Sequence, residues 1–225
     1  MAQTKIDMLA WMSSENPVDL LEKYVENGML AEELPEVFAL QGVPQNPLHH
    51  PEVDTFIHVK MALRIATALS VDPRVRFATL VHDLGKGLTP KDELPRHINH
   101  EKNGVELVRQ VAERFNVPDD WAWLGMVTSR WHLEVHRSLK ARAGPSIKLI
   151  VKAEFLDKPD LFNAFLLACE ADKRGRLGME EDPYPQVAYM KEVYKVVESI
   201  PGGVPFSVQK RVLALKPILA KYTEA

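Results

Sequence analysis

Residues 82–87 read HDLGKG, and this stretch says more about the fold and chemistry of the chain than any other. His82 and Asp83 offer a neutral imidazole and a hard carboxylate at neighbouring positions, a mixed pair that suits divalent cations such as Mn, Fe, Co, Ni or Mg. Gly85 and Gly87 open the backbone just after the pair, and Lys86 places a positive charge where a phosphate could approach. A His-Asp pair alone is common, so it becomes informative only with further His and Asp residues elsewhere in the chain.

Composition sets the broad class of the protein. The 225 residues carry a net charge of −3, with 46% hydrophobic and 26% charged residues, which is typical of an ordinary globular protein. Because nucleic-acid binders are usually basic, extended binding to a phosphate backbone is not expected, although a local basic pocket is compatible with this charge. The single cysteine, Cys169, excludes an internal disulfide and a cysteine-based zinc site, and its apolar neighbours predict a buried thiol. We see no secretory signal and no run of about 18 apolar residues, so we expect a cytoplasmic protein that does not span a membrane.

Apolar residues recur at helical spacing along almost the whole chain, and no convincing alternating strand is present. These features predict an all-α protein. Three prolines make the segment 41–53 an extended loop, and residues 86–96 form a second loop. Helices are expected over residues 18–27, 31–40, 54–69, 73–84, 98–115, 119–125, 126–137, 145–156, 159–173, 185–199 and 206–222.

Two of these helices frame the His-Asp pair. The helix over 54–69 is expected to begin at Asp54 or Thr55 as its N-cap. Its predicted apolar stripe consists of Ile57, Met61, Ile65 and Leu69. The helix over 73–84 begins at Pro73 and ends at Gly85, so the pair is expected at the C-terminal end of an inner helix.

Further histidines and carboxylates are candidates to join the pair. His58 lies between two apolar residues, where a lone histidine is usually a hydrogen-bonded core residue. Asp172 lies in a charge cluster at a helix end, which is usually solvated, but Asp172 and Glu170 cannot face the same way on a helix. One of the two is therefore expected to point inward. In chain order, His58, His82, Asp83 and Asp172 would supply two imidazoles and two carboxylates and leave coordination positions for water and substrate.

The roles of the remaining histidines stay open on sequence grounds. His97 and His100 are three residues apart and His132 and His136 are four apart, so each pair would share a helix face. If His100 and His132 point inward, they either complete a second metal site or serve as proton donors or hydrogen-bond partners for phosphate. The two histidines of the Pro-rich loop, residues 49–50, are expected to be exposed.

Several side chains near these positions fit a phosphate substrate. Each could contact phosphate oxygens, with arginine doing so bidentately, or could be an ordinary surface group. The candidates for substrate binding are Lys86, Arg96, His97, Arg174 and Arg176.

From about residue 18 to residue 200, the chain resembles the C-terminal HD portion of bacterial CCA-adding tRNA nucleotidyltransferases of the multifunctional type. The resemblance follows a long collinear series of segments. They are Pro35-Glu36, Gly42-Val43-Pro44, residues 50–55 with His58, residues 75–80, residues 82–90, Pro95-Arg96-His97, His100, His132, His136, Glu170-Ala171-Asp172, Arg174-Gly175-Arg176 and Gly178. The resemblance implies an HD-domain helical bundle and a metal-dependent phosphohydrolase with phosphatase, 2′-nucleotidase or 2′,3′-cyclic phosphodiesterase activity. By the same resemblance, His58, His82, Asp83 and Asp172 would be the metal ligands. Apart from the resemblance, we expect Asp83, His100 and His132 to be the catalytic residues, with His100 or His132 as the group that protonates the leaving oxygen.

The chain departs from that family in having no recognisable polymerase head, so it is not expected to add CCA to tRNA. A small phosphate ester, and among these a nucleotide, is therefore favoured over RNA or tRNA as the partner. The expected organisation is one compact unit, with an N-terminal helical segment over 1–50, the HD domain over 51–200 and a C-terminal helix over 201–225. That last helix closes the core or forms a dimer face.

Three functions are open at this stage. The leading one is hydrolysis of a phosphate ester with a divalent metal, which could be Mn, Co, Ni, Mg or Fe. The alternatives are a non-catalytic tRNA- or nucleotide-binding module and a di-iron HD oxygenase.

Overall fold

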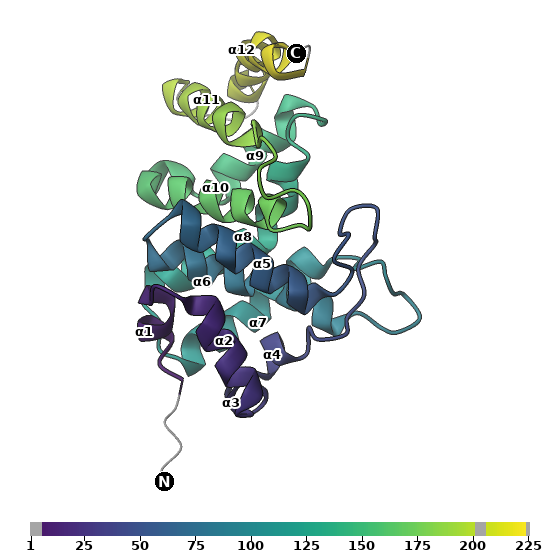
Figure 1. The fold of residues 1–225 in the computed structure, drawn as a ribbon. Coiled ribbons are helices and arrows are strands. Elements are labelled where there is room, and N and C mark those ends of the chain that lie inside the picture. The colour runs from purple at the N-terminus through teal and green to yellow at the C-terminus, as the bar shows by residue number, and fades with distance from the viewer. Residues whose placement is uncertain (1–5, 201–205, 224–225) are drawn as a thin grey trace.

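The fold is known here from a computed structural model that describes residues 6–200 and 206–223 (Figure 1). Across these two ranges it contains twelve α-helices, two short 3-10 turns and no β-strand, which confirms the all-α prediction. The domain boundary predicted at residue 201 lies outside the described residues. Among the same residues, no helix is long and apolar enough to cross a membrane.

The helices form three groups along the molecule (Figure 1). Four short helices lie at one end: α1 (Met8–Ser13), α2 (Pro17–Glu26), α3 (Met29–Glu33) and α4 (Pro35–Phe38). The middle group is α5 (Thr55–Leu69), α6 (Pro73–Val81), the turn η1 (Leu84–Leu88), α7 (His100–Arg114) and α8 (Asp119–His136). The remainder is α9 (Ala143–Lys152), the turn η2 (Phe155–Asp157), α10 (Pro159–Arg174), α11 (Gln186–Ser199) and α12 (Phe206–Thr223). The loops that follow α4 and η1 project together from one side of the middle group (Figure 1).

Side-chain caps fix where the two central helices begin. The Asp54 carboxylate accepts the Ile57 N–H at 2.9 Å, and Asp72 accepts the Arg74 N–H at 2.9 Å. Each cap satisfies one of the backbone donors that a helix start leaves unpaired. The predicted N-cap at Asp54 is thereby confirmed.

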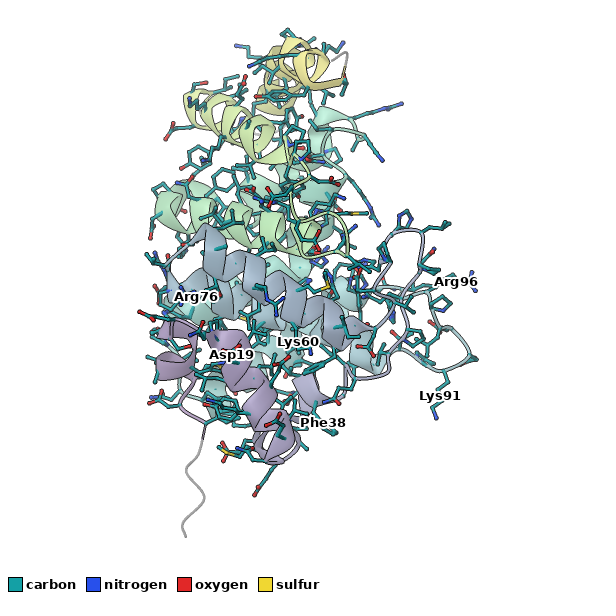
Figure 2. All side chains as sticks on the ribbon, in the orientation of Figure 1. Asp19, Phe38, Lys60, Arg76, Lys91 and Arg96 are labelled. Carbon is teal, nitrogen blue, oxygen red and sulfur yellow. The ribbon has the colours of Figure 1, made fainter. Side chains whose placement is uncertain are left out.

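The short helix α1 was not among the predicted helices. Its position is secured by buried Arg76 on α6, whose guanidinium donates to the carbonyls of Met12 and Ser14 at 2.9 and 2.7 Å (Figure 2). Six residues are too few for a clear helical period, so this helix depends on tertiary contacts that local sequence does not reveal.

A second difference concerns α8, which is one continuous helix where two were predicted. The predicted break fell at Gly125, but this glycine serves close packing instead. A Cβ at Gly125 would lie 3.0 Å from Phe77 of α6 and 3.0 Å from Val108 of α7, so a larger residue here would press on side chains of both neighbouring helices.

The predicted apolar stripe of α5 was also wrong at its first position, because Ile57 is 43% exposed. The buried face is made instead by Val59, Ala62, Leu63 and Ala66, and His58 lies with it. Helix α5 is covered by α6 and α10 as well as by α2, so more than one of its faces is buried and a single stripe does not describe it.

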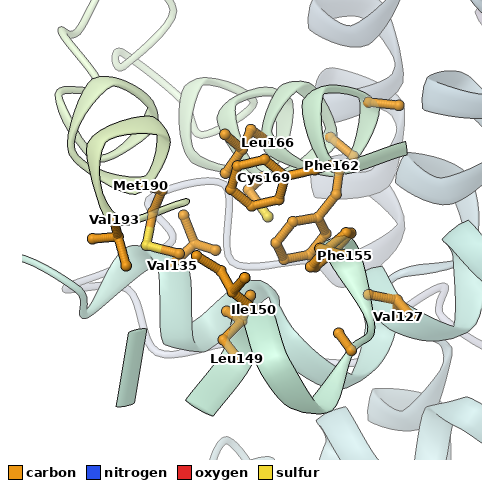
Figure 3. Packing of buried hydrophobic residues seen from close by; sticks show 14 of the residues in the cluster. Val127, Val135, Leu149, Ile150, Phe155, Phe162, Leu166, Cys169, Met190 and Val193 are labelled. Atoms are coloured by element: carbon orange, nitrogen blue, oxygen red, sulfur yellow. The ribbon is translucent and has the colours of Figure 1, made fainter. Parts of the chain in front are cut away.

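Two hydrophobic clusters hold the molecule together. One joins α1–α4 to the middle helices, and the other joins α8–α12 to one another and to α5 and α6. Figure 3 shows part of the second cluster, with Phe155 and Phe162 on one side and Met190 of α11 next to Val193 on the other. The thiol of Cys169 is buried in the same cluster. The buried thiol confirms the prediction for Cys169.

The final helix closes this second cluster. Leu215 of α12 is fully buried in it. Arg211 donates to the carbonyls of Val197 and Ile200 at 3.1 and 2.6 Å, so it caps the end of α11. A homodimer stays a prediction.

Candidate metal centre and its cavity

The candidate ligands meet between the two hydrophobic clusters, at the bottom of a cavity of about 290 Å³. Asp83, His100, His132 and Asp172 lie at its surface, and the loops after α4 and η1 supply part of its wall. Among the described residues, three groups of three ligand atoms are each compact enough to hold one ion, and two of these groups consist of residues considered above as metal ligands.

The first group consists of His58 on α5, His82 at the end of α6 and Asp172 on α10. Asp172 Oδ1 lies 3.1 Å from His58 Nε2 and 3.7 Å from His82 Nε2. Asp83 Oδ2 completes the arrangement at 3.1 Å from His82 Nε2 and 3.9 Å from His58 Nε2. The four residues expected as metal ligands are therefore brought together, and all four are buried.

The second group consists of Asp83, His100 at the start of α7 and His132 near the end of α8. Asp83 Oδ1 lies 3.4 Å from His100 Nε2 and 3.8 Å from His132 Nε2. Both histidines point inward, which was the condition left open by the sequence.

Hydrogen bonds orient the rings of three of these histidines in the same way. His82 Nδ1 donates to the Thr79 carbonyl at 2.7 Å, and His100 Nδ1 donates to the His97 carbonyl at 2.7 Å. His132 Nδ1 lies 3.0 Å from the Thr128 carbonyl. Since a carbonyl can only accept, Nδ1 carries the proton and the lone pair of a neutral ring is on Nε2, which faces the carboxylates.

The electrostatics of the cluster follow from burial and from opposite charges at close range. Burial alone would raise the pKa of Asp83 and of Asp172, but the neighbouring histidines, together with Lys86 in the case of Asp83, hold both well below the usual range. Burial lowers the pKa of His132 well below its ordinary value, and it also lowers that of His100. His82 differs, because the charges of Asp83 and Asp172 outweigh burial and raise its pKa.

The donor set fits a divalent metal. His82 Nε2, Asp83 Oδ1 and His100 Nε2 are buried and have no hydrogen-bond partner among the described residues. Leaving a buried polar atom unpaired costs free energy. A cation that accepts a lone pair from each of these three atoms would explain why they lie together without other partners. Imidazole and carboxylate ligands suit Mn, Fe, Co, Ni and Zn, so the ligand types alone do not select one metal.

Local structure explains how adjacent residues can both face the site. Helix α6 ends at Val81, and Asp83 leaves the helical conformation with φ −108° and ψ 12°. The turn η1 then lies directly on the start of α7, where a Cβ at Gly85 would be 2.1 Å from the His100 carbonyl oxygen. The glycine of the HDLGKG stretch thus permits the close approach that brings His100 to Asp83.

Three of the five residues expected to bind substrate line the cavity, namely Lys86, His97 and Arg176. Lys86 is buried and donates to Gln45 Oε1 at 2.5 Å, and its Nζ lies 2.6 Å from Asp83 Oδ2. His97 Nε2 donates to the Pro44 carbonyl at 3.0 Å, so Nδ1 of the neutral ring accepts from the Thr89 hydroxyl at 2.7 Å. His97 thus joins the two loops of the wall. Arg176 Nη2 lies 3.5 Å from Asp172 Oδ1.

The structure does not place the other two at the cavity. Arg96 is exposed on the projecting loop at the edge of the molecule (Figure 2). Arg174 contacts Glu170 at 3.1 Å and donates to the Glu180 carbonyl at 2.7 Å, away from the cavity lining. The pairing of Glu170 leaves Asp172 as the inward carboxylate, as the helix geometry required.

Sequence reasoning missed several residues of the site. His50 was expected to be exposed, but its ring is only 13% exposed and lies 4.8 Å from the His58 ring, because the Pro-rich loop folds back over α5. Arg137, which follows α8, lines the cavity, and so does His136, whose Nε2 lies 2.5 Å from Asp172 Oδ2. Glu52, one turn before α5, lies 3.1 Å from His58 Nδ1. The HPE sequence at 50–52 was a signal only through the family resemblance.

Fold and site together define a helical metal-binding protein of the HD type, and the family comparison agrees. The HD domain model matches residues 55–177, which is more than half of the chain, so the chain belongs to the HD-domain family. This family places the protein in a superfamily of metal-dependent phosphohydrolases.

Individual relatives of the chain identify a narrower group than the family model does. The chain is 48% identical over 166 residues to the multifunctional CCA protein of Hahella chejuensis, covering 74% of this chain and 39% of that protein. It is 44% identical over 187 residues to the multifunctional CCA protein of Acinetobacter baumannii, covering 83% and 45%. For the multifunctional CCA protein of Thioalkalivibrio sulfidiphilus, the identity is 44% over 179 residues, covering 80% and 44%. The predicted resemblance is confirmed, and the chain spans less than half the length of these relatives.

Proposed function

We propose that this protein hydrolyses the phosphate ester of a nucleotide with a divalent metal held by His58, His82, Asp83 and Asp172. The observation that carries the proposal is the convergence of buried ligand atoms without hydrogen-bond partners at the bottom of a cavity that cationic side chains also line. A bound metal would act as a Lewis acid on a phosphate oxygen and lower the pKa of a coordinated water.

We assign His100 and His132 to a second ion rather than to proton donation. Their Nδ1 atoms face backbone carbonyls, so each Nε2 lone pair is directed toward Asp83 Oδ1. Two lone pairs and a carboxylate oxygen repel one another unless a cation lies among them. With Asp83 contributing one oxygen to each group, this arrangement supports a two-ion site.

The side chains of the chain itself have distinct roles in this proposal. Arg176 and Arg137 supply positive charge on the cavity wall, and a guanidinium can hold a phosphate through two parallel hydrogen bonds. Lys86 is tied to Asp83 and Gln45, so its charge acts on the phosphate at short range from a fixed position. His97 keeps the two wall loops together and so maintains the shape of the cavity.

The cavity supports a small substrate. Its volume of about 290 Å³ is near the lower end of the range for small-molecule sites, about 300–1,000 Å³. A mononucleotide, either a 2′-, 3′- or 5′-monophosphate or a 2′,3′-cyclic phosphate, is therefore preferred over a folded RNA as the substrate. Binding of RNA or tRNA is the alternative, which follows from the family resemblance.

Phosphate release from a nucleotide panel tests the proposal. Metal-stripped protein would receive Mn²⁺, Co²⁺, Ni²⁺, Mg²⁺ or Zn²⁺ singly, with product analysis for the cyclic substrates. Asp83→Ala should lower metal-dependent turnover about a thousandfold, because several kcal/mol of charge stabilisation are lost with the metal. Asp160→Ala is the matched control, since that carboxylate is 66% exposed and remote from the cavity, and its turnover should equal that of the unmodified protein.

Two results would redirect the assignment. Metal binding without turnover, combined with tight RNA binding, would favour the non-catalytic binding module. The second group of ligand atoms, from Asp83, His100 and His132, is the specific observation that favours a di-iron oxygenase as the other candidate. That function would show as two irons per chain and an absorbance change on reduction.

A further inference from the structure

Glu52 is an almost completely buried carboxylate on the outer side of the ligand cluster, with its side chain only 1% exposed. A carboxylate in such a position requires partners that offset the loss of hydration. Glu52 is neither one of the proposed ligands nor part of the cavity lining, so the burial of its carboxylate needs another explanation.

Its partners come from three separate parts of the chain. Oε1 lies 3.1 Å from His58 Nδ1 and 2.9 Å from His50 Nδ1. Oε2 accepts the backbone N–H of Leu177 at 3.2 Å. Glu52 thus connects the Pro-rich loop, helix α5 and the segment after α10, which also carries Arg176.

The contact with His58 is the informative one. His58 Nε2 lies 3.1 Å from Asp172 and 3.9 Å from Asp83, on the side where the metal would be held. On the opposite side Nδ1 is buried and has no well-aligned hydrogen bond among the described residues, which leaves the Glu52 carboxylate at 3.1 Å as its neighbour. A carboxylate beside one ring nitrogen favours the proton there and leaves the lone pair on the other nitrogen.

We propose that Glu52 is the positioning residue of the metal centre: it keeps the proton of His58 on Nδ1, so that Nε2 is free to bind metal, and it anchors the backbone next to Arg176. The inference rests on the proposed function in so far as it assigns His58 as a ligand. It adds a residue that acts on the metal through His58 and on the substrate through the position of Arg176.

A separate ion held by Glu52 is the competing explanation, because His50, Glu52 and His58 lie close enough to hold one. Such an ion would take Nδ1 of His58, and the ring would then have to lose both protons to serve the main site as well. Nε2, the other nitrogen of the His58 ring, already lies near the carboxylates of Asp83 and Asp172. If Glu52 only positions His58, the ring keeps one proton on Nδ1 and need not become a doubly deprotonated imidazolate.

Metal affinity without substrate tests the proposal. Mn²⁺ would be titrated into the metal-stripped full chain and its free concentration followed by electron paramagnetic resonance. Glu52→Gln keeps the size of the side chain and removes its charge, and we expect about 10- to 100-fold weaker Mn²⁺ binding. Glu36→Gln is the matched control, because Glu36 is also a poorly exposed carboxylate but contacts Arg114 away from the cavity. Its Mn²⁺ affinity should be unchanged.

The protonation site of His58 gives a second readout that a merely structural role would not move. In ¹⁵N-histidine spectra of the Zn²⁺-loaded unmodified protein, we expect His58 protonated at Nδ1, and Glu52→Gln should broaden or shift that signal. Mn²⁺ affinity of Glu52→Gln within about twofold of the unmodified protein, or an unchanged His58 signal, would overturn the proposal. If Glu52→Gln does not fold, Glu52→Asp, which keeps the charge but is one methylene shorter, serves in the same titration.

This experiment separates the two proposals. Failure of the proposed function would appear as an unmodified protein that binds Mn²⁺ but releases no phosphate. The role of Glu52 would still be decided by the Mn²⁺ titration and by the His58 signal.

Discussion

Asp83 joins the two groups of ligand atoms through its two oxygens. Oδ2 lies near His82 and Lys86, whereas Oδ1 lies near His100 and His132. The Lys86 ammonium lies 2.6 Å from Oδ2, closer than the ring nitrogen of His82 at 3.1 Å. A buried charge that loses its partner is strongly destabilising, so Lys86 has a structural role besides its proposed action on phosphate.

We therefore expect Lys86→Met to lower the free energy of unfolding by about 3 kcal/mol in metal-free protein. The physical reason is that Asp83 would keep its charge while losing a partner at 2.6 Å in a site only 1% exposed. Saturating Mn²⁺ should reduce this loss, because the ion supplies positive charge to the same carboxylate. Urea denaturation with and without Mn²⁺ measures both values.

Lys60→Met is the appropriate control for that experiment. Lys60 also pairs with a carboxylate, Glu22, but the two side chains are 28% and 49% exposed. An exposed pair contributes less than about 1 kcal/mol, so this variant should change stability little, with or without metal. Equal losses for Lys86→Met in the two conditions would contradict a direct role beside the metal site.

Some residues of the site could be predicted from the sequence more readily than others. His82 and Asp83 could be identified from the HDLGKG stretch itself. The residues around His58 and Asp172 do not indicate a metal site, so these two were assigned through the family resemblance. Arg96 and Arg174 show the limit of reasoning from proximity in sequence, because side chains near a ligand in the chain point in many directions. The ligand roles remain predictions, although the structure brings the four residues together.

The approach of α5 and α10 determines how close His58 comes to Asp172. These helices touch at Gly175, where a Cβ would lie 2.4 Å from Ala62 Cα and 2.6 Å from Ala62 N. Both contacts are with backbone, which cannot move aside as a flexible side chain can. Gly175 is thus the point that sets the separation of the two helices.

Gly175→Ala should consequently push α10 away from α5. We expect a loss of about 1–3 kcal/mol in the free energy of unfolding, the usual range for overpacking a core. Mn²⁺ binding should also weaken, since Asp172 lies three residues before the contact on the same helix. Chemical denaturation and the Mn²⁺ titration would be carried out on the same preparation.

Gly144→Ala provides the comparison. A Cβ at Gly144, in the first turn of α9, would meet no atom within 4 Å. In that open position alanine should be neutral or stabilise by up to about 1 kcal/mol, because it restricts the unfolded chain. If the two variants behaved alike, the contact at Gly175 would not control the site.

Most of the longer helices followed from apolar periodicity, but α1 did not, the predicted helix 31–40 is divided into α3 and α4, and the packing of the helices could not be predicted. Gly125 illustrates the reason: a glycine inside a helical pattern can end a helix or allow two others to approach, and the choice depends on neighbours distant in sequence. The buried face of α5 was misassigned for a related reason, since a helix covered on several sides has no single apolar stripe.

Across the whole molecule, the proposed ligands are contributed by α5, the end of α6, α7, α8 and α10. His58 and Asp172 are 114 residues apart in sequence, yet their side chains are in contact in the folded protein. The unfolded chain cannot present these groups together, so metal should bind the native state alone. Binding then stabilises the protein by mass action, by about 2.7 kcal/mol at a free metal concentration 100 times the dissociation constant.

For a chain of this length, that free energy corresponds to a rise of about 5–10 °C in melting temperature. We expect Mn²⁺ to produce such a rise in metal-stripped protein and a chelator to reverse it, as measured by circular dichroism. Asp83→Ala should show a much smaller metal-dependent shift, because both groups of ligand atoms lose a member. A melting temperature unaffected by saturating Mn²⁺ would mean that the five elements do not form a metal centre, whatever their arrangement without it.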